Sequence, residues 1–205
     1  MLSKPLNPLK VHSSLLLGLA LTLVLSACGG DSSTGAAATT GSDTASATTP
    51  ARPAALAEQA DGTCGLANFQ SELLSRVNAY RAAGAVCGGV GYPAVGAVVW
   101  NGQLQQAANA HSTDMATNNF FAHQSATNGT TLRERVPAAG YNYLSAGENI
   151  AAGQTSIQVV VNEWMNSPSH CANTMKADFR DMGVSCVSNS ASTYGTYWTM
   201  ELGRR

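Results

Sequence analysis

Residues 197–202 read Tyr-Trp-Thr-Met-Glu-Leu, close to the end of a chain of 205 residues. In this stretch Trp198, Met200 and Leu202 alternate with residues of more polar character. Successive side chains of a strand point to opposite faces of its sheet. The alternation therefore predicts a strand that is buried on at least one face.

The preceding sequence predicts two more strands and four helices. The strands are expected at residues 146–152 and 182–187. Apolar residues at helical spacing predict the helices. The expected helices are 68–83, ended by Gly84; one that begins after the N-cap Asn101 and carries Leu104, Ala107, Ala108, His111 and Met115; 132–139, ended by Gly140; and one that carries Ile157, Val160, Val161 and Trp164 and ends at Ser167-Pro168. Helices followed by a terminal pair of strands indicate the α+β class.

The composition limits the classes of function. Charged residues make up 11% of the chain, the net charge is −1 and the pI is about 6.4. Nucleic-acid binding and a polybasic grip on anionic lipid both need a concentrated basic face. We therefore expect neither. Residues 64–205 carry 8 Lys and Arg against 8 Asp and Glu, and this length suits one domain with one core.

The first 27 residues are typical of a secretory signal peptide. A basic start precedes an apolar run over residues 15–25, which is shorter than the roughly 20 residues that a transmembrane helix needs. The run ends in Leu-Ser-Ala-Cys, which resembles the lipobox of bacterial lipoproteins and makes Cys28 the expected lipidation site. The alternative is an ordinary signal peptide with an incidental Cys. Gly29 stands where an Asp would resemble an inner-membrane retention signal, so an outer membrane, where the cell has one, is the expected location.

The segment 28–63 is expected to be a flexible tether after the lipidated Cys28. It consists mainly of Ala, Thr, Ser, Gly and Pro, and Leu56 is the only large aliphatic residue between positions 29 and 62. Such a segment buries too little apolar surface to offset the entropy lost on ordering. The folded domain is therefore expected at residues 64–205.

Four cysteines remain in this domain, and an exported chain meets an oxidising environment. Two disulfides are therefore expected, and three pairings are possible. The simplest is local and joins Cys64 to Cys87 and Cys171 to Cys186. A zinc site made by the four cysteines is the competing interpretation, but the chain has no Cys-x-x-Cys pair.

Seven short motifs follow one another along the domain. They are Trp100-Asn101 ahead of Leu104; Ala107-Ala108-x-x-His111-Ser112-x-Asp114-Met115; Phe120-Phe121-Ala122-His123; Ala139-Gly140-Tyr141; Gly147-Glu148-Asn149-Ile150-Ala151; Trp164-Met165-x-Ser167-Pro168-x-His170-x-x-Asn173; and Tyr197-Trp198-Thr199. In this order and spacing they resemble the CAP superfamily (cysteine-rich secretory proteins, antigen 5 and pathogenesis-related 1), also called the SCP domain, and its bacterial branch most. The resemblance covers nearly all of residues 69–203. It implies a three-layer α–β–α sandwich with an antiparallel central sheet.

The resemblance also implies a central cleft with two His and two Glu. By motif, His123, Glu148 and His170 match three of these four residues. The second Glu, which many eukaryotic members carry three residues after the Trp of the fourth helix, falls here on Ser167. Any mechanism that needs two carboxylates is therefore in doubt.

Three residues of this kind allow several kinds of chemistry. His123 and His170 can hold Zn²⁺ or another borderline divalent metal. Glu148 can then be a third ligand, orient a ligating His, or act as a base. Without a metal, a Glu–His pair can still transfer protons near neutral pH. The alternative is a hydrogen-bonded polar cluster that only holds loops in place. His111 is expected to pack on its helix with one hydrogen bond rather than act as a ligand.

Three functions follow from this interpretation. The favoured one is a lipid-anchored, monomeric, non-enzymatic module that binds a small hydrophobic or envelope ligand in the cleft, with or without a divalent metal. The second is a metal-assisted hydrolase of peptides or envelope polymers, with His123, Glu148 and His170 as catalytic residues. The third is a structural module of the envelope. No Gly-x-Ser-x-Gly elbow, His-Glu-x-x-His helix or phosphate-binding Gly loop is present in the sequence.

Overall fold

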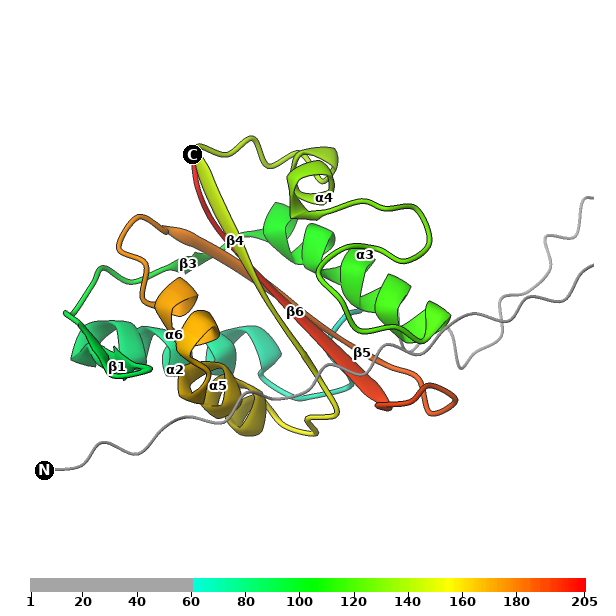
Figure 1. The fold of residues 1–205 in the computed structure, drawn as a ribbon, viewed down its shortest axis with the longest axis horizontal. Coiled ribbons are helices and arrows are strands. Elements are labelled where there is room, and N and C mark those ends of the chain that lie inside the picture. Colours follow the sequence, from blue (N-terminus) through cyan, green and yellow to red (C-terminus); the bar gives the residue numbers. More distant parts are fainter. Residues whose placement is uncertain (1–60) are drawn as a thin grey trace, which may run out of the picture. The chain divides into compact units, whose positions relative to one another are not determined.

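A computed structural model describes residues 61–205 of the chain (Figure 1). The predicted signal peptide, Cys28 and all but the last three residues of the predicted tether lie outside these residues. The helices are α2 (Phe69–Ala83), α3 (Gly102–Asn118), α4 (Leu132–Ala138), α5 (Ile157–Asn166) and α6 (Pro168–Thr174). The strands are β1 (Ala85–Cys87), β2 (Val90–Tyr92), β3 (Val99–Trp100), β4 (Ser145–Ala152), β5 (Asp181–Ser188) and β6 (Thr196–Arg204). Within residues 61–205, no helix combines the length and the apolar character needed to cross a membrane.

Four strands form the central sheet in the order β3-β5-β6-β4. β6 pairs antiparallel with both β4 and β5, whereas the two-residue strand β3 pairs parallel with β5. The predicted antiparallel central sheet is confirmed for β4, β5 and β6, and the short β3 adds a parallel pair at one edge. The reason is the connection: the chain leaves β3 into α3 and returns to β5 only after a long crossover, and crossovers produce parallel neighbours.

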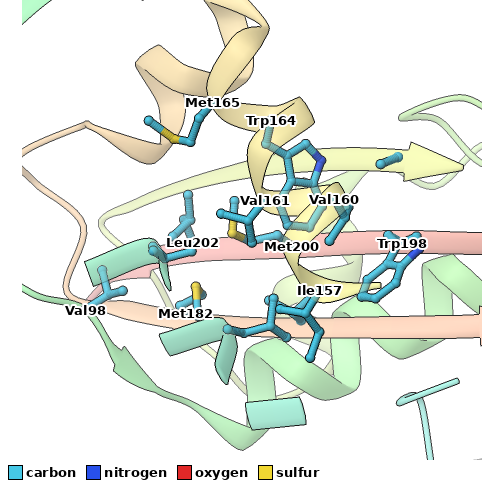
Figure 2. Close-up of a cluster of buried hydrophobic side chains, with 14 of the residues drawn as sticks. Val98, Ile157, Val160, Val161, Trp164, Met165, Met182, Trp198, Met200 and Leu202 are labelled. Atoms are coloured by element: carbon cyan, nitrogen blue, oxygen red, sulfur yellow. The ribbon is translucent and has the colours of Figure 1, made fainter. Parts of the chain in front are cut away.

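The alternation in β6 places different side chains on the two faces of the sheet. Trp198, Met200 and Leu202 belong to the main core, which α2 and α5 cover. Figure 2 shows side chains of α5 packed over these strand residues. Tyr197 lies in a smaller core on the opposite face, together with Met115 of α3. Helices therefore cover both faces, as the predicted three-layer sandwich requires.

Local signals set the helix boundaries much as predicted. The Asn101 side chain accepts hydrogen bonds from the amides of Gln103 (3.0 Å) and Leu104 (3.2 Å), which caps α3. The Thr131 side chain and Glu134 form a capping box at the start of α4. The short helix α6 was not predicted. It begins directly at Pro168, a residue suited to the first turn of a helix because its missing N–H has no partner there.

A buried arginine joins the first helix of the domain to the segment before β5. Arg81 is fully buried, and its guanidinium donates to the carbonyls of Gly96 (2.8 Å), Thr174 (2.6 Å), Lys176 (3.1 Å) and Phe179 (3.1 Å). Four carbonyl acceptors thus satisfy a cation that forms no ion pair with a carboxylate of residues 61–205. Arg81 fixes the end of α6 against α2.

The predicted disulfide pairing is wrong. The structure joins Cys64 to Cys186 and Cys87 to Cys171, so neither bond is local. The segment before α2 runs beside β5, where the Cys64 amide donates to the Cys186 carbonyl (3.1 Å). The small β1–β2 hairpin lies against α6, which brings the other pair together. Tertiary packing, which local spacing does not encode, decides the pairing.

The two pairings can be told apart by chemical mapping. We expect peptides that contain Cys87 and Cys171 to be linked after digestion without reduction, and Cys64 to be found with Cys186. The double variant Cys87→Ala/Cys171→Ala should lose about 2–5 kcal/mol of unfolding free energy, because the bond constrains a long loop in the unfolded chain. Mass spectrometry and urea denaturation test both points. A Cys64–Cys87 peptide would contradict the topology.

Candidate functional site

The strand β4 supports the candidate site from the edge of the sheet. Among residues 61–205 it pairs only with β6, and the Gly147-Glu148-Asn149 motif lies in its middle. Because neighbouring residues of a strand point to opposite faces, Glu148 and Asn149 serve different layers of the sandwich. Glu148 contacts the layer of α3 and α4, and Asn149 contacts α6.

Glu148 is the centre of a buried ion pair and hydrogen-bond network. Its side chain is 4% exposed; one oxygen lies 2.6 Å from Nδ1 of His123 and the other accepts from the guanidinium of Arg135. Burial alone would raise the pKa of Glu148. Hydrogen bonds from His123 and Glu201, together with the Arg135 charge, outweigh burial and lower this pKa to about 2. Glu148 is therefore a carboxylate throughout the physiological range.

Glu201 is a second carboxyl group in this cluster, and sequence analysis missed it. It lies directly opposite Glu148 in the β4–β6 register, and it is fully buried. Burial raises the pKa of Glu201 well above its ordinary value, and the neighbouring Glu148 charge raises it further. As a carboxylate, Glu201 would find no hydrogen-bond donor among residues 61–205. As a carboxylic acid, it donates to Glu148.

The local sequence pattern gives no signal that Glu201 is buried. An acidic residue that alternates correctly within a strand is typical of a side chain that faces solvent. Here β6 is a central strand, and α3 packs against the face that holds Glu201. Gly183, which lies opposite Glu201 on β5, allows this approach, since a Cβ there would collide with the backbone of Leu104 and Gln105. Only the strand order reveals that both faces are covered.

Two side chains, His111 and Arg135, form hydrogen bonds with backbone carbonyls of the loop that carries His123. The Ala122 carbonyl lies 2.9 Å from Nε2 of the buried His111, and the His123 carbonyl accepts from Arg135 (3.1 Å). His111 thus packs with one hydrogen bond, as expected. Burial lowers the pKa of His111, so its ring is neutral and Nε2 donates. The His123 side chain itself is 59% exposed and presents its outer edge to solvent.

His170 approaches β4 from the other layer. Its carbonyl accepts from the Asn149 side chain (3.0 Å) and from the Thr174 hydroxyl (2.9 Å), and Asn173 donates to Asn149 (2.9 Å). Burial lowers the pKa of His170, and the charge of His123 lowers it further. The structure therefore brings His123, Glu148 and His170 to one edge strand, with Glu148 bonded only to the first of the two histidines.

A pocket of about 290 Å³ opens beside His170. Its walls are mostly apolar and include Phe121 and Trp164, and its polar members are His170, Ser167, Gln154 and Glu163. Ser167, which stands in place of the second Glu, thus does reach the pocket. Glu163 also lines it and accepts a hydrogen bond from Gln154. A mostly apolar hollow with a few polar groups is the usual form of a small-molecule site.

The donor set does not match a zinc site built from three protein ligands. Residues 61–205 contain no group of three or more His, Cys, Asp or Glu side chains placed to hold a metal ion. Glu148, for which a role as third ligand was one of three possibilities, contacts His123 with one oxygen and Arg135 with the other. Direct ligation by Glu148 would compete with these contacts, whereas a metal on the exposed Nε2 of His123 would leave Glu148 to orient that ring. The four domain cysteines are all in disulfides, so a cysteine zinc site is excluded.

The sandwich, the mixed sheet and the His–Glu edge strand together define a domain of the CAP or SCP type. A model of the cysteine-rich secretory protein family (CAP) matches residues 74–202. The chain belongs to this family.

Relatives in Bacillus subtilis share part of the sequence. The uncharacterized protein YkwD is 39% identical over 98 residues, which are 48% of this chain and 36% of the relative. The uncharacterized membrane protein YlbC is 33% identical over 85 residues, which are 42% of this chain and 24% of the relative. The match thus spans about a third or less of each relative's length.

Two solved structures are similar to parts of this chain. An extracellular protein of Bacillus anthracis that contains an SCP domain is 32% identical, with a TM-score of 0.47 over 54% of this chain and 35% of that one. An outer surface protein of Borrelia burgdorferi is 19% identical, with a TM-score of 0.52 over 66% of this chain and 89% of that one. The second likeness shows the architecture alone.

The protonated Glu201 makes stability depend on pH in a defined direction. In the folded protein Glu201 keeps its proton at pH values where the unfolded chain has released it, so this group lowers the unfolding free energy by up to about 1.4 kcal/mol for each pH unit in that interval. Glu201→Gln still donates to Glu148 but does not titrate. We expect the variant to gain stability relative to the parent, more at about pH 8 than at about pH 5.

Urea denaturation at both pH values measures this difference. Glu163→Gln, at an exposed position, is the matched control and should show no such pH-dependent gain. An equal effect of Glu201→Gln at both pH values would mean that Glu201 is ionised in the folded protein.

Proposed function

We propose that this chain is an exported, lipid-anchored CAP protein that binds a small, mostly apolar ligand of the cell envelope in the pocket beside His170. The observation that carries the proposal is this pocket of about 290 Å³, with apolar walls and an imidazole at its side. The expected leader, Cys28 and tether support a position at a bacterial membrane, with the domain held away from the lipid surface.

The groups around the pocket indicate the ligand's polarity. The lowered pKa of His170 keeps its ring neutral near pH 7, where it can donate or accept one hydrogen bond. Phe121 and Trp164 provide aromatic walls. An uncharged molecule with an apolar body and a hydroxyl group fits this lining. The ligand would lie against β4, next to the exposed edge of His123.

A simple alcohol tests the pocket. We expect 4-phenylbutan-1-ol to bind saturably to the full chain, with shifts of the NMR signals of Phe121 and His170. Ala152→Phe, which fills the pocket, should abolish binding, and His170→Ala should weaken it about threefold to tenfold, the effect of one hydrogen bond. Ala79→Phe, at an exposed position of α2, is the matched control. Binding that survives in Ala152→Phe would place the alcohol elsewhere and refute the proposal.

Hydrolysis is the second candidate function, because the His123–Glu148 contact of 2.6 Å is the geometry of an oriented general base. We expect no turnover of a fluorogenic peptide library by the parent, with or without added Zn²⁺. An enzyme would instead lose turnover in His123→Gln while it kept its fold. Glu148→Gln is the second variant, and circular dichroism must show that it folds, since it leaves Arg135 without its carboxylate. Turnover lost in both folded variants would favour hydrolysis over binding.

A further inference from the structure

A second and larger pocket lies on the other side of the sheet. It has a volume of about 600 Å³, is open to solvent, and is bordered by α3, α4 and the loop at residues 128–130. Its lining includes four alanines, which we call the alanine floor and which lie beside polar side chains such as Thr113 and Thr117: Ala107 and Ala110 of α3, and Ala138 and Ala139 at the end of α4. Small side chains on two facing helices leave the space between them unfilled. The pocket shares no lining residue with the one beside His170.

The charged groups of this second pocket are arranged asymmetrically. Asp114 and Glu134 are its acidic lining residues, and Arg135 is its single basic one. Arg135 is 8% exposed, and its charge is already paired with Glu148. Asp114 and Glu134 therefore have no free basic side chain to pair with among the residues that line the pocket. Arg133 lies near Glu134 on α4 but does not line the pocket.

Both carboxyl groups are held in place by hydrogen bonds. Asp114 accepts from Ser125 (2.5 Å), Thr127 (3.0 Å) and Asn118 (2.8 Å), which fixes it at the wall. Hydrogen bonds from Thr131 lower the pKa of Glu134. The pocket therefore combines an apolar floor with a negative rim that is fixed before any ligand arrives. Preorganised charge of this kind favours ligands of the opposite sign.

We propose that this pocket binds a cationic amphiphile, whose aliphatic body lies on the alanine floor and whose ammonium group lies between Asp114 and Glu134. The volume is within the usual range for small-molecule sites, about 300–1,000 Å³. An anionic amphiphile such as a fatty acid would meet the same rim with repulsion. Arg135 forms part of this pocket and also contacts Glu148, so an occupant would lie one side chain away from the His–Glu pair.

Decylamine, which is protonated at neutral pH, is the probe, and decanoate is its anionic counterpart of equal length. We expect the full chain to bind decylamine saturably below the micelle concentration, by isothermal titration calorimetry, and decanoate at least about tenfold more weakly because two carboxylates repel it. Ala110→Phe, at an exposed position of α3, should abolish decylamine binding by filling the pocket. Glu134→Gln keeps the acceptor for Thr131 but removes the charge, and should weaken binding about twofold to fivefold.

Two controls separate this site from the rest of the molecule. Ala79→Phe makes the same change on the exposed face of α2 and should bind decylamine as the parent does. Ala152→Phe closes the pocket beside His170 and should also leave decylamine binding intact, so that a failure there does not affect this proposal. Decylamine binding that persists in Ala110→Phe would overturn the site. Decanoate binding as tight as decylamine binding would overturn the cationic class, and no saturable decylamine binding would overturn both.

Discussion

The ion pair between Arg135 and Glu148 is the contact on which the rest of the site depends. Glu148 lies on an edge strand with Glu201 directly opposite on β6, and both carboxyl groups are buried. Two buried carboxylates cannot share such a space, so one keeps its proton and the other needs a cation. Arg135 provides that cation: the nitrogen that donates to Glu148 also donates to the His123 carbonyl, and the other terminal nitrogen donates to the Thr130 carbonyl. One side chain thus neutralises the charge and shapes the loop above it.

The Gly-Glu-Asn motif works through the alternation of side chains along β4, because neighbouring residues of a strand point to opposite faces of the sheet. Glu148 reaches the segment that carries His123, and Asn149 reaches the helix that carries His170. Gly147 is required because a Cβ would run into the side chains of Asn173 and Phe179. Consecutive residues of one strand therefore fasten histidines that come from opposite layers of the sandwich. His123 and His170 are 47 positions apart in the sequence. These two contacts of β4 explain how their segments meet at one edge of the sheet.

Local chemistry made much of the fold predictable. The cap at Asn101, the break at Pro168 and the alternation of Trp198, Met200 and Leu202 each act within a few residues, and the structure confirms the elements that they predicted. Disulfide partners, the parallel strand β3 and the burial of Glu201 depend instead on which distant segments become neighbours. The local disulfide prediction paired cysteines that are close in sequence, and for this reason it missed the bond between Cys64 and Cys186. The family motifs pointed to His123, Glu148 and His170, but not to Arg135 and Glu201, the cation and the second acid beside Glu148.

The two histidines of the candidate site are not equivalent, and this asymmetry is one reason why we propose binding rather than hydrolysis. His123 is oriented by a carboxylate, as a general base would be, but its ring is largely exposed to water. His170 borders the pocket; within residues 61–205 its ring accepts or donates no hydrogen bond with a carboxylate. Ser167, where a second carboxylate would stand, offers only a hydroxyl. His123 is thus an oriented base that faces solvent, and His170 is a neutral ring at the pocket that no carboxylate of residues 61–205 orients. This arrangement suits the recognition of an uncharged ligand better than the concerted movement of protons.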